Sequence, residues 1–275
     1  MALGERQYID RINHYVDIKV EFGCNSFGFE KQNYMSKRNS RMANAPVVTD
    51  VKMLQGVLDA LNSLVADVCF LQIGSNDGKT GDPIHEFVIK YNWNGILVEP
   101  VNYLFEKLKG NYANAQGNLT FLNVAVSDQN TEMRLHRLPK SSDITLPFWY
   151  DQLASLHKDV VLTHKTMIPN IEDLMIEESV RTMTIGQLLD VCSVKRLDLV
   201  HIDTEGHDDT IMKQLDFRRL NSQIVIFEHK HMKGVDVSKW MRYFEKFKFR
   251  LFIFENDIVA VSEDVLAKWN DGRSV

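Results

Sequence analysis

The sequence predicts an α/β fold in which a mostly parallel sheet of about seven strands carries helices on both faces. Three observations favour this class. Short runs rich in β-branched and aromatic residues alternate with helical segments from residue 68 onwards. A glycine-bracketed turn follows the first of these runs. The last two runs are separated by Asn256-Asp257, a turn dipeptide that predicts an antiparallel C-terminal hairpin and so a departure from a plain dinucleotide-binding fold.

Composition excludes several classes of protein. The 275 residues are 44% hydrophobic and 25% charged, which is typical of a globular enzyme and excludes disordered and fibrous proteins. The net charge of -5 provides no basic field, so we expect no nucleic-acid partner. Residues 1–10 carry Glu5 and Arg6 before any apolar stretch, and no run approaches the about 20 apolar residues of a membrane span. We therefore expect a cytoplasmic protein without a membrane partner. The cysteines are too few and too scattered for a disulfide framework or a thiolate metal site: Cys24, Cys69 and Cys192.

The chain divides into an arm and a domain. Residues 1–48 are predicted to form an arm or lid, because Asn, Arg, Ser and Lys crowd residues 25–44; an unstructured leader is the alternative. Thr49-Asp50 is a credible N-cap for a helix over residues 51–65, whose apolar residues recur at helical spacing. A domain over residues 49–275 begins there.

Seven runs are predicted strands, and one segment interrupts them. The expected strands are 68–73, 95–98, 119–126, 197–202, 223–228, 249–255 and 258–262. Between residues 134 and 178 the alternation breaks, with three prolines, an aromatic triplet and several histidines. We expect a substrate-facing insertion there, because loops over sheet ends carry binding more often than scaffolding. Its histidines lack ligand spacing and are expected mainly at solvated positions: His136, His157 and His164.

The turn after the first strand has the composition of a ligand site. Its glycines permit a sharp turn and close approach to a ligand, at the start of a predicted helix. The turn lacks the G-x-G-x-x-G pattern of nicotinamide binding, and its acid would repel a pyrophosphate. A cationic or zwitterionic ligand therefore suits it better. Its residues are Gly74, Ser75, Asn76, Asp77 and Gly78.

The second strand ends in an acid followed by proline. Glu99 lies 21 residues after Gly78 and precedes Pro100. An acid at this strand end is placed to accept both hydroxyls of a ribose. The alternative is that Glu99 only caps the next helix.

Five motifs, taken together in this order and spacing, resemble the FkbM-type family of S-adenosylmethionine-dependent methyltransferases. The likeness covers roughly residues 68–262 and does not reach the arm. The motifs are 70–78 (FLQIGSNDG), 96–100 (ILVEP), 123–128 (NVAVSD), 197–206 (LDLVHIDTEG) and 226–229 (IFEH).

The resemblance implies the seven-stranded, Rossmann-like sheet of class I methyltransferases and S-adenosyl-L-methionine as cofactor. It implies that the 74–78 turn holds the methionine end of the cofactor and Glu99 its ribose. It further implies that the adenine edge is held by Asn123, Val124 and Ala125.

One position departs from the class. Gln72 stands where an Asp or Glu often helps to hold the cofactor ammonium. Asp77 or Asp82 would have to take that role.

Acids and histidines follow the fourth and fifth strands, whose carboxyl ends should bear the chemistry. Asp203 and Glu205 would point the same way if the strand continued, with Asp203 also near the cofactor. Three readings stay open: a His or Asp base that deprotonates a hydroxyl, a divalent cation (Mg, Mn or Fe) held by Asp203, Glu228 and His229, or ordinary polar side chains. The candidate catalytic residues are Asp203, Glu205, His207, Glu228 and His229, with His231 next to them.

The predicted function is O-methylation of a hydroxyl on a small metabolite, such as a sugar, polyketide or peptide natural product. The acceptor class follows from the family resemblance alone. An N-methyltransferase on the same scaffold and a non-catalytic cofactor-binding module are the alternatives.

Overall fold

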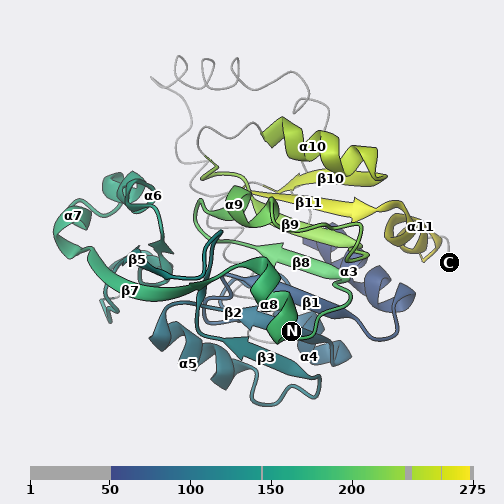
Figure 1. The fold of residues 1–275 in the computed structure, drawn as a ribbon, viewed down its shortest axis with the longest axis horizontal. Coiled ribbons are helices and arrows are strands. Elements are labelled where there is room, and N and C mark those ends of the chain that lie inside the picture. Colours follow the sequence, from purple (N-terminus) through teal and green to yellow (C-terminus); the bar gives the residue numbers. More distant parts are fainter. Residues whose placement is uncertain (1–50, 144, 233–236, 255, 273–275) are drawn as a thin grey trace.

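A computed structural model describes residues 51–143, 145–232, 237–254 and 256–272. The predicted arm, and the predicted N-cap at Thr49-Asp50, lie outside the described residues. The central element is a seven-stranded sheet in the order β10-β11-β9-β8-β1-β2-β3 (Figure 1). Its strands are β1 (Cys69–Ile73), β2 (Asn94–Val98), β3 (Leu119–Leu122), β8 (Leu199–Ile202), β9 (Ile224–Glu228), β10 (Phe249–Phe254) and β11 (Asp257–Ser262).

Strand directions confirm the predicted fold class. The strands from β3 through β2, β1 and β8 to β9 pair in parallel. Only β11 is antiparallel, to β9 on one side and to β10 on the other. The predicted C-terminal hairpin is present, with Phe254 opposite Asp257. Because the central strands are parallel, their carboxyl ends lie along one edge, where an open α/β sheet binds its ligands.

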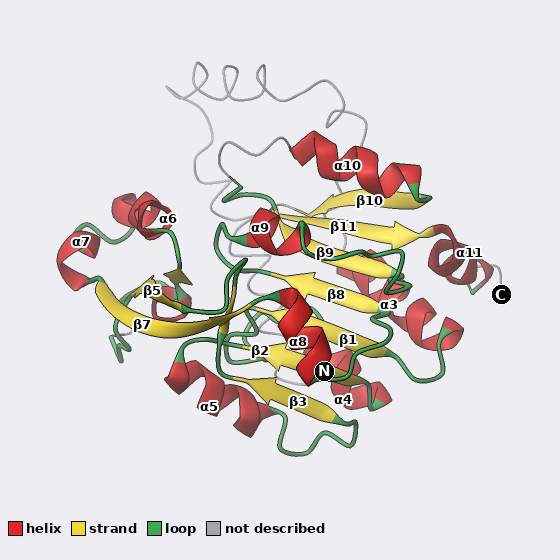
Figure 2. Cartoon of the chain, viewed as in Figure 1, coloured by secondary structure: helices red, strands yellow, loops and turns green. Residues whose placement is uncertain are grey.

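Helices cover both faces of the sheet (Figure 2). Successive side chains of a strand point to opposite faces, and β1 follows this rule: Phe70 packs into one apolar layer, whereas Leu71 and Ile73 pack into the other. The first layer contains residues of α3 (Val51–Leu64), α4 (His85–Tyr91), α5 (Asn102–Asn111) and α11 (Glu263–Asp271); the second contains residues of α8 (Ile185–Val191), α9 (Asp208–Met212) and α10 (Val237–Lys246). No helix among the described residues is long and apolar enough to cross a membrane.

The strand predicted over 119–126 is wrong in its second half. The chain leaves the main sheet after Leu122, which is the partner of the last residue of β2. The Asn123 side chain then donates to the carbonyl oxygens of Glu99 and Pro100, which follow β2. Residues Ala125–Val126 form a separate strand, β4, in a second sheet.

Residues 125–183 build this second sheet and a small core of their own. The sheet has the order β4-β7-β5-β6, with β5 (Glu132–Arg137), β6 (Ala154–Ser155) and β7 (Ile176–Met183). Between β6 and β7 lie α6 (Lys158–Leu162), η3 (Thr163–Thr166) and α7 (Ile171–Leu174). Their apolar core consists of Leu138, Tyr150, Leu153, Val161, Ile168 and Ile171. The segment predicted as an insertion is therefore folded, and Figure 1 shows it beside the carboxyl ends of the main strands.

Candidate functional site

The turn after β1 fits tightly against its neighbours. The N–H groups of Gly74 and Ser75 both donate to the Val98 carbonyl oxygen, each at 3.0 Å. Gly74 has φ 77°, and a Cβ atom there would overlap the Asp203 carbonyl oxygen. Only glycine combines this backbone conformation with this approach. The turn after β1 and the loop after β8 are thus in direct contact.

Glu99 joins the same turn to the next helix. Its carboxylate is buried and accepts from the N–H of Asn76 at 2.8 Å and from the N–H of Val101 at 2.8 Å. Burial raises the pKa of Glu99 to about 7, although these two hydrogen bonds act in the opposite direction. The Val101 contact is the capping role considered for Glu99, since α5 starts directly after it. Each carboxylate oxygen has a second lone pair, so capping and ribose binding are compatible.

Gln72 lies in a buried polar network at the end of β1. Its side-chain N–H group donates to Asp82 Oδ2 at 2.8 Å and to His201 Nδ1 at 3.0 Å. Burial lowers the pKa of His201, in keeping with a neutral ring that accepts from Gln72. Gln72 Oε1 is buried and accepts no hydrogen bond from the described residues. This oxygen is therefore an acceptor still available for a donor of a ligand.

Two acids near this network, Asp77 and Asp82, already accept hydrogen bonds from backbone N–H groups. Asp77 accepts from the N–H groups of Lys79 and Thr80 and from the Thr80 hydroxyl. Asp82 Oδ1 accepts from the N–H groups of residues 84 and 85, where α4 begins. The observed contacts of both carboxylates are with nearby backbone N–H groups, so these side chains stabilise local turns.

The segment predicted to hold adenine lies at the junction of the two sheets. Asn123 is exposed, but its amide N–H group is engaged with the chain after β2 at 2.8 and 3.1 Å. Val124 and Ala125 are buried in two different apolar clusters. The segment thus forms the wall beside Glu99.

The chain turns sharply after β8. The prediction that Asp203 and Glu205 share one face of a continuing strand is wrong, because β8 ends at Ile202 and Glu205 has φ 52°. The reason is Asp208, which accepts from the Thr204 hydroxyl at 3.0 Å and from the Gly206 N–H at 3.2 Å and so folds the chain into α9. Burial, followed by the charge of Asp203, raises the pKa of Asp208 to about 7.

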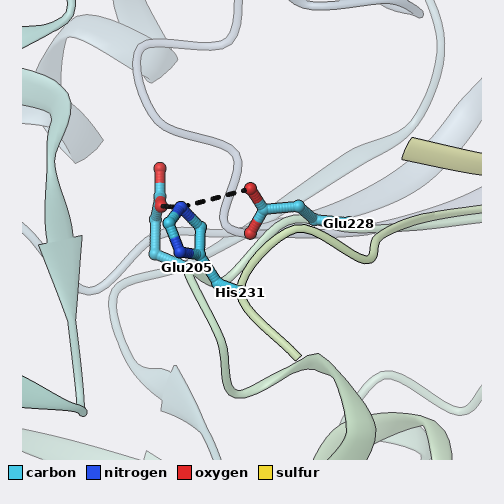
Figure 3. A group of neighbouring side chains, drawn as sticks. All are labelled: Glu205, Glu228 and His231. Atoms are coloured by element: carbon cyan, nitrogen blue, oxygen red, sulfur yellow. Dashed lines mark ion pairs between the residues drawn. The ribbon is translucent and has the colours of Figure 1, made fainter. Parts of the chain in front are cut away.

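Glu205, Glu228 and His231 meet at the ends of β8 and β9, and we call them the strand-end cluster (Figure 3). His231 Nε2 lies 3.2 Å from Glu205 Oε2 and 3.7 Å from Glu228 Oε1. Burial and neighbouring carboxylates raise the pKa of Glu205 to about 8 and that of Glu228 to about 12. Asp203 is exposed, and its charge contributes to the raised pKa of Glu99, Glu205 and Glu228, so it lies near both Glu99 and the cluster.

His207 belongs to a different network. Its Nε2 lies 3.1 Å from Ser127 Oγ and its Nδ1 lies 3.0 Å from His157 Nε2. Burial lowers the pKa of His207 to about 4, and His157 contributes, so the ring is neutral at pH 7. His229 is half-buried, and its backbone N–H donates to the Asn256 carbonyl oxygen. The third member of the cluster is His231, which the sequence placed among several candidates without distinguishing it.

The insertion covers the strand-end cluster. Ser155 Oγ donates to the Glu205 carbonyl oxygen at 2.7 Å. The His164 ring lies 5.6 Å from the His231 ring and 5.0 Å from the Trp149 ring. The expectation that His164 is solvated is wrong: it is buried, because the insertion packs its aromatic residues against the sheet edge. Only the aromatic triplet at 148–150 signalled this in the sequence.

The family of the chain is decided by a sequence comparison. The model of the methyltransferase FkbM domain matches residues 72–251, well over half of the chain. The chain belongs to this family. The FkbM domain is an S-adenosylmethionine-dependent methyltransferase domain, and its matched residues include Gln72, the 74–78 turn, Glu99 and the strand-end cluster. The predicted family is confirmed.

Solved structures similar to this FkbM domain are distant. One is the METTL16 methyltransferase domain, with 9% identity, a TM-score of 0.38, and coverage of 76% of this chain and 66% of that chain. Another is an S-adenosylmethionine-dependent methyltransferase from Agrobacterium tumefaciens, with 7% identity, a TM-score of 0.36, and coverage of 78% of this chain and 62% of that chain. A putative class I methyltransferase from Listeria monocytogenes is also similar, with 10% identity, a TM-score of 0.37, and coverage of 77% of this chain and 58% of that chain. The chain thus spans less than two thirds of each of these relatives. No curated protein matches the sequence.

Proposed function

We propose that this FkbM domain transfers the methyl group of S-adenosylmethionine to a hydroxyl oxygen of a small metabolite, such as a sugar, a polyketide or a peptide natural product. The observation that supports it most is the contact between the 74–78 turn, to which we assign the cofactor, and the loop after β8, which carries Asp203 and Glu205 of the strand-end cluster. An alcohol must lose its proton as it attacks a sulfonium methyl group. Carboxylates and an imidazole at that place supply groups that can receive or release the proton.

The proposed step balances as follows. The acceptor O–H proton passes to a carboxylate or to water, and the oxygen forms a bond to the methyl carbon. The carbon–sulfur bond breaks, and its electron pair stays on sulfur. The products are the methyl ether and neutral S-adenosylhomocysteine.

For the cofactor, we assign the ribose hydroxyls to Glu99, the methionine end to the 74–78 turn and the adenine to residues 123–125. Gln72 Oε1 would accept from the ammonium, because it is the buried acceptor without a partner at the end of β1. Asp77 and Asp82 would act mainly through the turns that they hold. The side-chain contacts of Gln72 and Asp82 then replace the missing acid of the class.

For the acceptor, we assign the pocket to the exposed Asp203, the insertion and the N-terminal arm over residues 1–48. The insertion already contacts the loop after β8 through Ser155. A divalent cation, Mg or Mn, is the second route by which the acceptor could lose its proton.

The test is transfer of a labelled methyl group to a panel of hydroxylated and amine-bearing metabolites. We expect label on hydroxyl oxygens. If Asp203 is the base, Asp203→Asn should lower kcat by about 10²- to 10⁴-fold at saturating cofactor. Asp209→Asn is the matched control, because Asp209 is a half-buried acid of the neighbouring α9 that pairs with Lys213.

The panel also distinguishes the alternatives. Label on amines alone would replace the proposal by N-methylation. Binding of the cofactor without transfer to any acceptor would indicate a binding module. Turnover of Asp203→Asn near that of the unchanged protein would leave positioning as its contribution.

A further inference from the structure

We propose that Glu205, Glu228 and His231 form a binding site for one divalent cation of the Mn²⁺ or Mg²⁺ type. The site itself is inferred from the geometry of the strand-end cluster. Its use in catalysis rests on the proposed methyl transfer, because the cation would then face the acceptor hydroxyl.

The distances within the cluster suit a shared ion. One ligand atom from each residue can be chosen so that all three lie within 4.8 Å of one another. The distances from His231 Nε2 are 3.2 Å to Glu205 Oε2 and 3.7 Å to Glu228 Oε1. Adjacent ligands of an octahedral ion with bonds of about 2.1 Å are roughly 3 Å apart. Two carboxylates and one imidazole are ligands that suit Mn²⁺ or Mg²⁺ better than a closed zinc site.

The burial of Glu228 provides a second, independent observation. Its side chain is 7% exposed, and its Oε2 is buried without a hydrogen-bond donor among the described residues. A buried carboxylate oxygen without a partner is costly, unless the group is protonated or bound to a cation. His231 Nε2 carries at most one proton, which cannot satisfy Glu205 and Glu228 together.

The charges around the cluster point in the same direction. Asp203, Asp208 and Asp257 all act on Glu228, and each disfavours its negative form. The positive charge of Lys230 has the opposite effect on Glu205, because it lowers the pKa of Glu205, but Lys230 is exposed. A divalent cation would compensate two carboxylates at once.

A cation at this place has a clear chemical use. It would lower the pKa of an acceptor hydroxyl placed against it, so that the proton leaves before or during attack on the methyl group. The cluster lies next to Asp203, which could receive that proton. Glu205 and Glu228 would then hold the ion and would not themselves act as bases.

The experiment titrates the full chain, freed of metal by chelator, with Mn²⁺ and follows binding by calorimetry and by the loss of the free-Mn²⁺ electron paramagnetic resonance signal. We expect one Mn²⁺ per chain. Glu228→Gln and His231→Gln should each weaken binding by more than about 100-fold. Glu177→Gln is the matched control, because Glu177 also pairs with a histidine, His136, but lies outside the cluster.

Each outcome decides one claim. Lack of Mn²⁺ uptake at about 1 mM by the unchanged protein, or equal uptake by Glu228→Gln, would overturn the site. Binding of S-adenosylhomocysteine shows that a variant is folded, and Mn²⁺ uptake by the unchanged protein tests the site without any variant. Transfer that persists in chelator would overturn the catalytic use of the cation and keep the proposed function. Mn²⁺ binding without transfer to any acceptor would keep the site and reject that function.

Discussion

Glu99 joins two loops through one side chain, and it is also the acid to which we assign the ribose. Its two oxygens accept from N–H groups of the cofactor turn and of the start of α5, so its position is fixed before any ligand binds. Preorganised acceptors lose little freedom on binding and so contribute much of their interaction energy. The raised pKa, about 7, means that its charge changes within the physiological range.

We predict that Glu99→Ala weakens binding of S-adenosylhomocysteine by about ten- to a hundredfold, the equivalent of roughly 1.5 to 3 kcal/mol for a charge-assisted hydrogen bond. The affinity of the unchanged protein should rise from pH 6 to pH 8, because loss of the Glu99 proton turns a donor oxygen into a further acceptor and makes the hydrogen bonds from the ribose charge-assisted. Calorimetric titration measures both effects. Glu106→Ala, an exposed acid of α5 that pairs with Lys109, is the control. An unchanged dissociation constant for Glu99→Ala would limit Glu99 to capping.

At the scale of elements, the contact between the loops after β1 and β8 fixes the site. Gly74 allows the two strand ends to approach each other, and the Asp203 N–H donates to the Ile73 carbonyl oxygen across the same junction. The 74–78 turn and the loop carrying Asp203 are therefore held together by direct backbone contact at this junction. Any side chain at residue 74 would separate them.

We predict that Gly74→Ala destabilises the protein by more than about 1 kcal/mol and strongly weakens cofactor binding, since both the positive φ and the overlap with Asp203 oppose a Cβ atom. Gly186→Ala is the matched control: it lies in α8 with open space around its added carbon. That change should stabilise the protein by about 0.5 to 1 kcal/mol. Urea unfolding and calorimetry measure both variants. Equal stability of the two would show that the junction tolerates separation.

The strands were predictable because their signals are local. Apolar runs bounded by turn residues placed the strands of the main sheet, and the Asn256-Asp257 turn placed the hairpin. The turn over residues 74–78 and the acid at the end of β2, Glu99, also have local signals, whereas their assignment to the cofactor stays a prediction. The errors concern contacts between distant segments: Asp208 ends the extended stretch after β8, and Asn123 separates β4 from β3. The strand-end cluster contains His231 and not His229. Which of the two histidines joins it depends on how the chain turns after β9, and the spacing of apolar residues does not predict that turn.

At the scale of the whole molecule, buried acids at the sheet edge link stability to pH. The pKa values of Glu99, Glu205, Asp208 and Glu228 are all raised in the folded state. The folded protein thus binds more protons than the unfolded chain above about pH 4.5, and these groups reduce stability as the pH rises towards their folded pKa values. His207, whose pKa is lowered, acts in the opposite direction below about pH 6.5.

We predict that Glu228→Gln is more stable than the unchanged protein in chelator, and that the difference grows from pH 5 to pH 8. The amide keeps the shape of the side chain and needs no proton, whereas the Glu228 carboxyl must take up a proton on folding, which costs more as the pH rises. The difference in Tm should widen by about 3 °C or more, which corresponds to about 1 kcal/mol in a chain of this size. Thermal unfolding by circular dichroism checks this, with Glu177→Gln as control. A constant difference across this range would mean that Glu228 does not titrate differently in the folded state.

We also predict that a chain lacking the residues before Pro46 keeps its affinity for S-adenosylhomocysteine but loses methyl transfer. The cofactor contacts assigned above all lie at residue 72 or beyond, whereas the arm is assigned to the acceptor pocket. Calorimetry and the labelled-methyl assay separate the two properties. Failure of the shortened chain to fold would make the arm a structural part of the domain.

The first and last strands of the segment that forms the second sheet, β4 and β7, lie next to each other. β4 and β7 pair in parallel, with Ala125 opposite Thr182 and Val126 opposite Met183, and the Ser127 N–H donates to the Met183 carbonyl oxygen. The chain between these strands is closed at its base like a loop, and lengthening such a loop costs little free energy. Its outer part can therefore be lengthened or shortened without disturbing the pairing of the seven strands of the main sheet. If the insertion lines the acceptor pocket, as proposed above, the choice of acceptor can evolve separately from the seven-stranded sheet.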